Sequence, residues 1–213
     1  MNDFRIITAY NGKNNSLIWP FLERLIEYST YNGYKFSFDI ERFENAQYKL
    51  QYINEQLNKE SEKYLVWLDI DIFIKNLNMR LESIINSDYD ISISSDNNGI
   101  CSGFMAVKNN EWNKKLFNSL AFLGQTDNID LVSSSQIGSF LIKNGSHFDQ
   151  DSLKVIFNYY KECKNHIYLI DENIIQNPES TFNEYAFAYH FWGMWNNSPA
   201  VMLEKINKVK ASI

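Results

Sequence analysis

The stretch of sequence that decides the fold is residues 64–71, YLVWLDID. It begins with an apolar run of strand length, and the side chains on both of its faces are apolar, as in a strand buried on both sides. Two carboxylates, Asp69 and Asp71, follow where the run ends. Ligands of open α/β sheets bind at the carboxyl ends of the strands, and paired carboxylates there attract a divalent cation such as Mg²⁺ or Mn²⁺. We therefore expect a metal site at the end of this strand.

The Asp-x-Asp spacing is weak evidence by itself, because so short a motif recurs by chance. The sequence repeats the spacing at Asp88/Asp90 and at Asp149/Asp151. The pair at Asp88 and Asp90 precedes a short strand-like segment, a context typical of a solvated turn. Only the pair that begins with Asp69 follows a long apolar run, and this context makes it the candidate site.

The segments before residue 64 alternate between strand and helix patterns. The first helical segment ends at Asn32-Gly33, as helices often end at a glycine. The expected elements are a strand at 4–10, a helix at 17–30, a strand at 34–40 and a helix at 44–60. This strand-helix-strand-helix-strand order predicts an α/β fold with a mostly parallel sheet flanked by helices.

The second half of the chain is expected to complete the same sheet. Its predicted elements are a helix at 77–85, strands at 91–94 and 104–107, helices at 111–122 and 149–160, and a strand at 167–170. A length of 213 residues suits one domain. We therefore expect a single domain over residues 1–213.

The composition argues against several classes of partner and location. The net charge is −6 at pH 7 and no run of Lys or Arg is present, so a nucleic-acid partner is not expected. The two cysteines, Cys101 and Cys163, lack the spacing of a metal or redox motif and are expected to be free thiols. The sequence contains no recognisable signal peptide and no apolar run of membrane-span length, so we expect a cytoplasmic chain without a membrane span.

Four parts of the chain carry a family resemblance. They are residues 27–34 (EYSTYNGY), residues 67–74 (WLDIDIFI), residues 98–107 (NGICSGFMAV), and the late motifs Asp149-Gln150 and His190-Phe191-Trp192-Gly193. These motifs resemble those of metal-dependent glycosyltransferases of the GT-A fold. The sequence is most similar to the family of yeast mannan α-galactosyltransferases and plant xyloglucan α-xylosyltransferases. The resemblance implies a Rossmann-like, mixed but mostly parallel sheet.

The resemblance also implies an activity. It implies transfer of a sugar from a UDP-sugar to a glycan or glycoprotein acceptor, with retained anomeric configuration and dependence on Mn²⁺ or Mg²⁺. A viral capsid glycan is one candidate acceptor. Residues 1–95 would form the nucleotide-binding half and residues 96–213 the acceptor-side half. Related families place a lysine for the donor phosphate where this chain has Asn196, so more of the phosphate charge would rest on the metal.

The same resemblance assigns Asp69, Asp71 and His190 as metal ligands. A neutral imidazole suits Mn²⁺, although a histidine among aromatic residues is more often a packed core residue. Ile70, between the two carboxylates, is assigned to the cofactor site with them. Gly193 would let the backbone approach the phosphates closely.

Residues at the ends of the first two strands are candidates for binding the nucleotide. Thr8, Ala9 and Tyr10 end the first strand, where GT-A folds hold the nucleotide, and the Tyr10 ring could stack on the base. Asp39 ends the second strand and could accept a hydrogen bond from a base N–H. The alternatives are a loop aromatic for Tyr10 and a turn or cap residue for Asp39.

Asp149 and Gln150 are the catalytic candidates. Retention requires either a carboxylate nucleophile or a front-face route in which the leaving phosphate deprotonates the acceptor. Either residue could stabilise an oxocarbenium-like centre, and Asp149 is equally suited to capping the helix that follows it. Ser102 and Gly103 are expected to line the acceptor side.

Two other functions are compatible with parts of the sequence. Haloacid-dehalogenase-type phosphatases also carry Asp-x-Asp after an apolar strand, but their motif has Thr or Val where this chain has Phe73, and it usually follows the first strand. A non-catalytic nucleotide-sugar or glycan-binding module would keep the aromatic residues without turnover. Enzyme turnover distinguishes this last alternative from a transferase.

Overall fold

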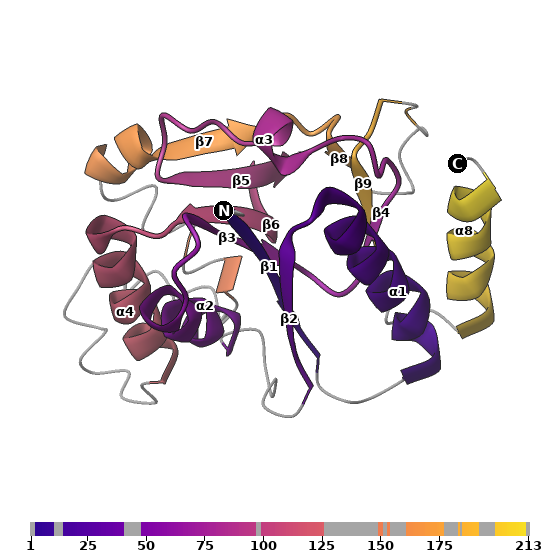
Figure 1. Cartoon of the computed structure of the whole chain (residues 1–213), viewed down its shortest axis with the longest axis horizontal. Coiled ribbons are helices and arrows are strands. Elements are labelled where there is room, and N and C mark those ends of the chain that lie inside the picture. The colour runs from indigo at the N-terminus through magenta and orange to yellow at the C-terminus, as the bar shows by residue number, and fades with distance from the viewer. Residues whose placement is uncertain are drawn as a thin grey trace.

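A six-stranded mixed sheet forms the centre of the computed structural model, with helices on both faces and a smaller three-stranded sheet beside it (Figure 1). The structure describes residues 3–10, 15–40, 48–96, 99–125, 149–150, 153, 161–176, 183, 185–191 and 199–211. Within this part of the chain, no helix is long and apolar enough to cross a membrane.

The large sheet has the strand order β2-β1-β3-β6-β5-β7. Its strands are β1 (Phe4–Ala9), β2 (Lys35–Asp39), β3 (Tyr64–Leu68), β5 (Ile91–Asp96), β6 (Gly99–Lys108) and β7 (Ile167–Ile170). β6 runs antiparallel to both of its neighbours, β3 and β5, whereas the other pairs are parallel. The predicted mixed, mostly parallel sheet is therefore confirmed. The carboxyl ends of β1, β2 and β3 consequently share one edge of the sheet.

A small sheet with the order β4-β9-β8 lies beside the large one, and the sequence patterns did not predict it. Its strands are β4 (Ile72–Ile74), β8 (Ile175–Gln176) and β9 (Ala188–His190). β4 pairs antiparallel with β9, and Ile72 lies opposite His190. The pairing joins the segment just after β3 to a segment more than a hundred residues later.

Helices cover both faces of the large sheet. They are α1 (Asn15–Asn32), α2 (Tyr48–Lys59), α3 (Leu81–Ile84) and α4 (Glu111–Gln125). The other helical segments are α8 (Pro199–Ala211) and a 3₁₀ turn at Lys161–His166. One cluster of buried apolar side chains joins α1 and α3 to one face of the large sheet, and a second such cluster joins α2 and α4 to the other face. A third cluster packs α8 against α1 and the small sheet. Apolar packing therefore covers both faces of the large sheet, which agrees with the apolar side chains on both faces of β3.

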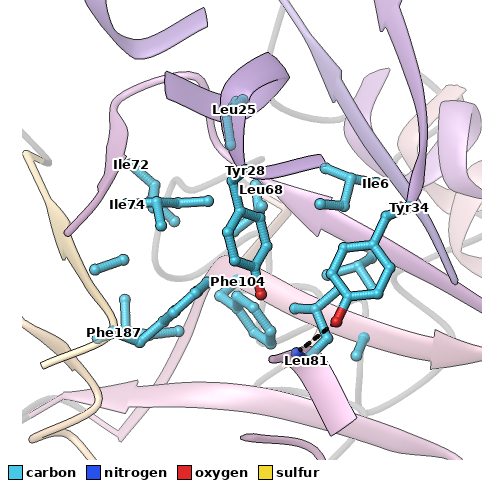
Figure 2. Close-up of a cluster of buried hydrophobic side chains, with 14 of the residues drawn as sticks. Ile6, Leu25, Tyr28, Tyr34, Leu68, Ile72, Ile74, Leu81, Phe104 and Phe187 are labelled. Carbon is cyan, nitrogen blue, oxygen red and sulfur yellow. Dashed lines mark hydrogen bonds between the residues drawn. The ribbon is translucent and has the colours of Figure 1, made fainter. Parts of the chain in front are cut away.

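Two buried tyrosines organise the core beneath α1 (Figure 2). The Tyr28 hydroxyl donates a hydrogen bond to the carbonyl of Met79 at 2.8 Å. The Tyr34 hydroxyl donates to Glu82 at 2.6 Å and accepts from the N–H of Leu81 at 3.1 Å. Burial, followed by the hydrogen bond to Glu82, raises the pKa of Tyr34 to about 12. Both rings thus combine apolar burial with a satisfied polar end, which ties α3 to the core.

The helix predicted at 77–85 is shorter in the structure, where only Leu81–Ile84 is helical. The side-chain oxygen of Asn76 accepts a hydrogen bond from the N–H of Asn78 at 3.0 Å, which stabilises a turn in place of the first helical turn. The predicted end of the first helix is found at Asn32, followed by Gly33 with φ of 72°. Most of the helix predicted at 149–160 lies outside the described residues.

Two further expectations from the sequence concern Asp90 and the two cysteines. Asp90 is only part-exposed, and its carboxylate accepts a hydrogen bond from the Asn110 amide at 2.5 Å. This hydrogen bond anchors the start of β5, so Asp90 is not simply a solvated turn residue. Neither Cys101 nor Cys163 forms a disulfide, as expected, and both side chains are buried.

A buried ion-pair network at the opposite edge of the sheet generates a prediction for stability. Arg5 donates two hydrogen bonds to Glu62, at 3.1 and 3.2 Å, and Lys35 forms an ion pair with the same carboxylate. Burial alone would raise the pKa of Glu62, but the hydrogen bonds from Arg5 and Lys35 outweigh it and lower the pKa to about 2. The stability from this lowered pKa is present above about pH 4.5 and is lost as the pH falls towards 2.

We therefore expect Glu62→Gln to lower the free energy of unfolding by roughly 1–3 kcal/mol at pH 7. Chemical denaturation of both proteins between pH 7 and pH 2 would show the difference shrinking towards zero at the acid end. Glu111→Gln, in an exposed ion pair with Lys114, is the matched control and should change little. A Glu62→Gln effect that is constant across this pH range would contradict the interpretation.

Candidate functional site

A tight turn after β3 carries the two carboxylates of Asp69 and Asp71 at the edge of the large sheet. The N–H of Asp69 donates to the carbonyl of Gly103 on β6 at 2.8 Å, which continues the β3–β6 pairing by one residue. The N–H of Ile72 then donates to the carbonyl of Asp69 at 2.9 Å, and β4 begins. Ile70 and Asp71 occupy this turn and are both buried. The chain therefore turns away from the large sheet at this edge, with both carboxylates close together.

His190 joins this pair through the small sheet. Its Nε2 atom lies 3.3 Å from Oδ1 of Asp71 and 3.7 Å from Oδ2 of Asp69. One ligand atom from each of the three residues lies within 4.8 Å of the others. The N–H of Phe191 donates to the carbonyl of Asp71 at 3.0 Å and secures the pairing next to the histidine. Two oxygen donors and one imidazole nitrogen fit a divalent cation such as Mn²⁺.

The local charges explain the protonation of this cluster. Burial raises the pKa of Asp69, and the nearby Asp71 carboxylate raises it further, against the lowering effect of Lys49. Burial would lower the pKa of His190, but the Asp71 carboxylate outweighs burial and raises the pKa well above its ordinary value. The carboxylates thus favour a proton on His190, and a cation that binds at Nε2 would have to displace it.

The sequence analysis missed Lys49, which lies in α2 and is 3% exposed. Its Nζ atom lies 2.8 Å from Oδ1 of Asp69 and 2.7 Å from Oδ2 of Asp149. Burial would lower the pKa of Lys49, but the carboxylates of Asp149 and Asp69 outweigh it and raise the pKa. A signal was available, because Lys49 lies four residues before Ile53 on the apolar face of the helix, and a lysine is seldom buried without a partner.

The two oxygens of Asp69 have separate partners. Oδ1 accepts hydrogen bonds from the Trp67 indole N–H at 2.6 Å and faces the Lys49 ammonium, whereas Oδ2 faces His190. The Lys49 ammonium also lies 5.4 Å from the centre of the Trp67 ring. Trp67 and Lys49 therefore hold the carboxylate so that Oδ2 points towards the metal-ligand cluster.

Asp149 and Gln150 lie against β6 at the same place. The Ser102 hydroxyl donates to Oδ2 of Asp149 at 2.5 Å, and the N–H of Ser102 donates to the Gln150 side-chain oxygen at 3.3 Å. Lys49 also donates to the Ser102 carbonyl and hydroxyl, both at 3.2 Å. The structure thus joins the two catalytic candidates and Ser102 to Asp69 through one buried lysine.

Gly103, the other residue expected on the acceptor side, lies directly against the His190 ring. A Cβ atom at this glycine would lie 2.3 Å from the Cε1 atom of His190. The glycine therefore leaves the space that the imidazole occupies.

The residues expected to bind the nucleotide gather at the ends of β1 and β2. Ala9 lies opposite Asp39, and the N–H of Tyr10 donates to the Asp39 carbonyl at 2.8 Å. The Asp39 carboxylate accepts a hydrogen bond from the Tyr48 hydroxyl at 2.9 Å. The side-chain hydroxyls of Thr8 and Tyr10 are buried and have no hydrogen-bond partner among the described residues. Gly193, the last expected site residue, lies outside the described residues.

Comparison with known proteins identifies the fold. The sequence matches no protein-family model and no curated protein. The structure is similar to a glycosyltransferase involved in glycosylation of the major capsid of PBCV-1, with a TM-score of 0.69, 15% identity and 98% coverage of both chains. It is also similar to the galactosyltransferase LgtC in complex with donor and acceptor sugar analogues, with a TM-score of 0.55, 11% identity, and coverage of 98% of this chain and 100% of LgtC.

A third neighbour is a Drosophila β1,4-galactosyltransferase 7 mutant in complex with manganese, UDP-Gal and xylobiose. Its TM-score is 0.50 at 10% identity, and the match covers 92% of this chain and 73% of that one. Similarity at such low identity shows the fold, and the chain therefore has the GT-A fold that its motifs predicted. The strand order, with β6 reversed between β3 and β5, and these neighbours give no support to the phosphatase alternative.

The buried lysine generates a prediction for stability. We expect Lys49→Met to lower the free energy of unfolding by about 3 kcal/mol, because it leaves Asp69 and Asp149 without their shared positive charge. Urea denaturation followed by circular dichroism would measure the change. Lys59→Met, on the same helix but exposed, is the control and should change stability by less than about 0.5 kcal/mol. Equal effects of the two substitutions would show that Lys49 has no such role.

Proposed function

We propose that this GT-A-fold chain is a metal-dependent, retaining glycosyltransferase that moves a sugar from a UDP-sugar to a glycan or glycoprotein acceptor. One observation carries the proposal: Asp69, Asp71 and His190, which are remote in sequence, meet at the carboxyl edge of the sheet with ligand atoms within 4.8 Å of one another. A fold hosts many functions, so the proposal rests on this site and not on the fold alone.

Asp69, Asp71 and His190 would hold a divalent cation, with Mn²⁺ favoured by the mixed oxygen and nitrogen ligands and Mg²⁺ as the alternative. When bound, the cation would supply Lewis-acid stabilisation of the negative charge on the leaving diphosphate. Trp67 and Lys49 fix the orientation of Asp69 before any ligand binds. The manganese and UDP-Gal in the Drosophila neighbour are consistent with this assignment.

The nucleotide would lie at the neighbouring strand ends. Thr8, Ala9, Tyr10 and Asp39 share the edge of the sheet that carries Asp69. Buried hydroxyls are normally hydrogen-bonded. The hydroxyls of Thr8 and Tyr10 have no partner within the described part of the chain, and this supports a polar ligand here. Ile70 would line the cofactor site, and Gly193 would approach the phosphates.

Asp149 and Gln150 would act at the reacting carbon. Lys49 and Ser102 both bond Oδ2 of Asp149, and a carboxylate paired in this way is a weaker nucleophile than a free one. We therefore assign Asp149 to electrostatic stabilisation of the developing positive charge, and the transfer to a front-face route in which the leaving phosphate accepts the acceptor proton. Gln150 stays in place through its hydrogen bond from Ser102.

The acceptor would approach beside β6, where Ser102 and Gly103 lie. A glycan or glycoprotein is the acceptor class, and a viral capsid glycan is one candidate because the PBCV-1 neighbour acts in capsid glycosylation. We place the nucleotide-binding half at residues 1–95 and the acceptor-side half at residues 96–213, in one domain.

Calorimetric titration of UDP tests the metal and donor assignments together. We expect binding in the presence of Mn²⁺ and none in EDTA. Asp71→Asn should abolish the Mn²⁺-dependent binding, because it removes one charge and one ligand from the cluster, while circular dichroism should show an unchanged fold. Asp88→Asn, at the exposed first residue of the Asp88/Asp90 pair, is the matched control and should bind like the unchanged protein.

UDP binding that survives in EDTA or in Asp71→Asn would refute the metal assignment. Mn²⁺-dependent UDP binding without turnover of any UDP-sugar would favour the binding-module alternative. A panel of UDP-sugars, followed by ¹H NMR of the anomeric product signal, decides between them and reports the stereochemistry.

The role of Asp149 has its own test. We expect Asp149→Asn to reduce kcat by roughly 10²–10³-fold, with little change in the donor KM, because the lost charge acts mainly on the transition state. Added azide should not restore turnover. Formation of a glycosyl azide by Asp149→Ala would identify Asp149 as a covalent nucleophile and contradict the front-face assignment.

A further inference from the structure

We propose that Cys101 and Gly103 are positioning residues, which together hold the His190 ring with its Nε2 atom towards Asp69 and Asp71. The inference rests on the proposed metal site and extends it to residues that do not touch the metal or the substrate. It also gives Gly103 a role beyond the acceptor side.

The contacts around the imidazole come from two sides. Sγ of Cys101 lies 3.5 Å from Nδ1 of His190, within the range of a hydrogen bond to sulfur. A Cβ atom at Gly103 would lie 2.3, 2.7 and 2.9 Å from Cε1, Nδ1 and Nε2 of the ring. These distances show that the imidazole packs directly on the Gly103 backbone. The opposite ring nitrogen, Nε2, is the one that faces Asp71 at 3.3 Å.

An irregularity in the β5–β6 pairing lies beside both residues. Ile93 of β5 pairs with Met105, but the next residue, Ser94, pairs with Cys101, so residues 102–104 have no partner on β5. The Ser94 hydroxyl donates to the carbonyl of Cys101 at 2.7 Å and stabilises the irregular backbone. Bulges of this kind redirect side chains and are frequent beside active sites.

The contact between Cys101 and Nδ1 favours the tautomer of His190 that carries its proton on Nδ1. A cation at Nε2 needs the lone pair of that nitrogen, so the ring proton must stay on Nδ1. Sγ of Cys101 lies where it can accept a hydrogen bond from Nδ1–H. Groups that accept this hydrogen bond fix the tautomer and orientation of metal-binding histidines, and their loss typically weakens metal binding by about 10–100-fold.

Mn²⁺ titration of the full chain by calorimetry tests the inference. We expect Cys101→Ala to weaken Mn²⁺ binding by about tenfold, the lower end of the usual range. Gly103→Ala should weaken it by at least as much, because the new methyl group must displace the ring. Cys163→Ala is the matched control: Cys163 is an equally buried cysteine, at 8% exposure, but it packs in the apolar cluster of α2 and α4, which does not include His190. It should bind Mn²⁺ within about twofold of the unchanged protein.

The same two substitutions in a His190→Ala background separate positioning from a general structural effect. If Cys101 and Gly103 act through the ring, neither substitution weakens Mn²⁺ binding further once the ring is gone. Further weakening in that background would overturn the inference, as would full Mn²⁺ affinity in Cys101→Ala and Gly103→Ala.

A measurement without metal distinguishes failure of this inference from failure of the proposed function. We expect a nuclear Overhauser effect between the His190 Hε1 proton and a Gly103 Hα proton in the metal-free protein. Its absence would refute the ring position. Its presence in a chain that binds no Mn²⁺ would uphold the contact with Gly103 and refute the metal site itself.

Discussion

The balance of charge at the end of β3 is the constraint on which the rest of the site depends. Asp69, Asp71 and Asp149 bring three carboxylates to a largely buried place, where like charges repel more strongly than they do in water. Lys49 supplies one positive charge, and the Asp71 carboxylate favours a second one on His190. Exchange of the histidine proton for a divalent cation would supply the third. A bound cation would therefore bring the site closer to neutrality, and this balance of charge supports the proposed metal site.

The small sheet brings His190 to the two carboxylates at the end of β3. β4 begins immediately after the turn that carries Asp71, and its pairing with β9 sets Ile72 opposite His190. The buried cluster of α1, α8 and the small sheet holds this pairing from outside. The irregular part of β6 then closes the site from the other side, where Ser102 reaches Asp149 and Gly103 supports the histidine. Each site residue is thus held by an element with its own apolar packing.

The sequence predicted regular, strongly patterned elements and missed short ones. The first three strands and the helices between them were found, because each has a clear apolar period and the expected breaks. The three strands of the small sheet have two or three residues each, too few for a period to be visible. Lys49 is hard to recognise because it belongs to a mostly polar helix, although its place on the buried face of α2 is a signal that the sequence carries. The candidate site residues that lie within the described part of the chain gather at one sheet edge, and their roles remain predictions.

What the sequence determined by itself was the α/β class, the mostly parallel sheet and the position of the carboxylate pair, because apolar periodicity and strand ends are local properties. Only the tertiary structure decided which distant groups face that pair. His190 reaches it by pairing of β9 with β4, Lys49 by burial of α2, and Asp149 through Ser102 on the irregular part of β6. These contacts join residues that are 20 or more positions apart in the chain, and their spacing carries no local signal. The packing of the whole sheet therefore determines the chemistry that a short, common motif can perform.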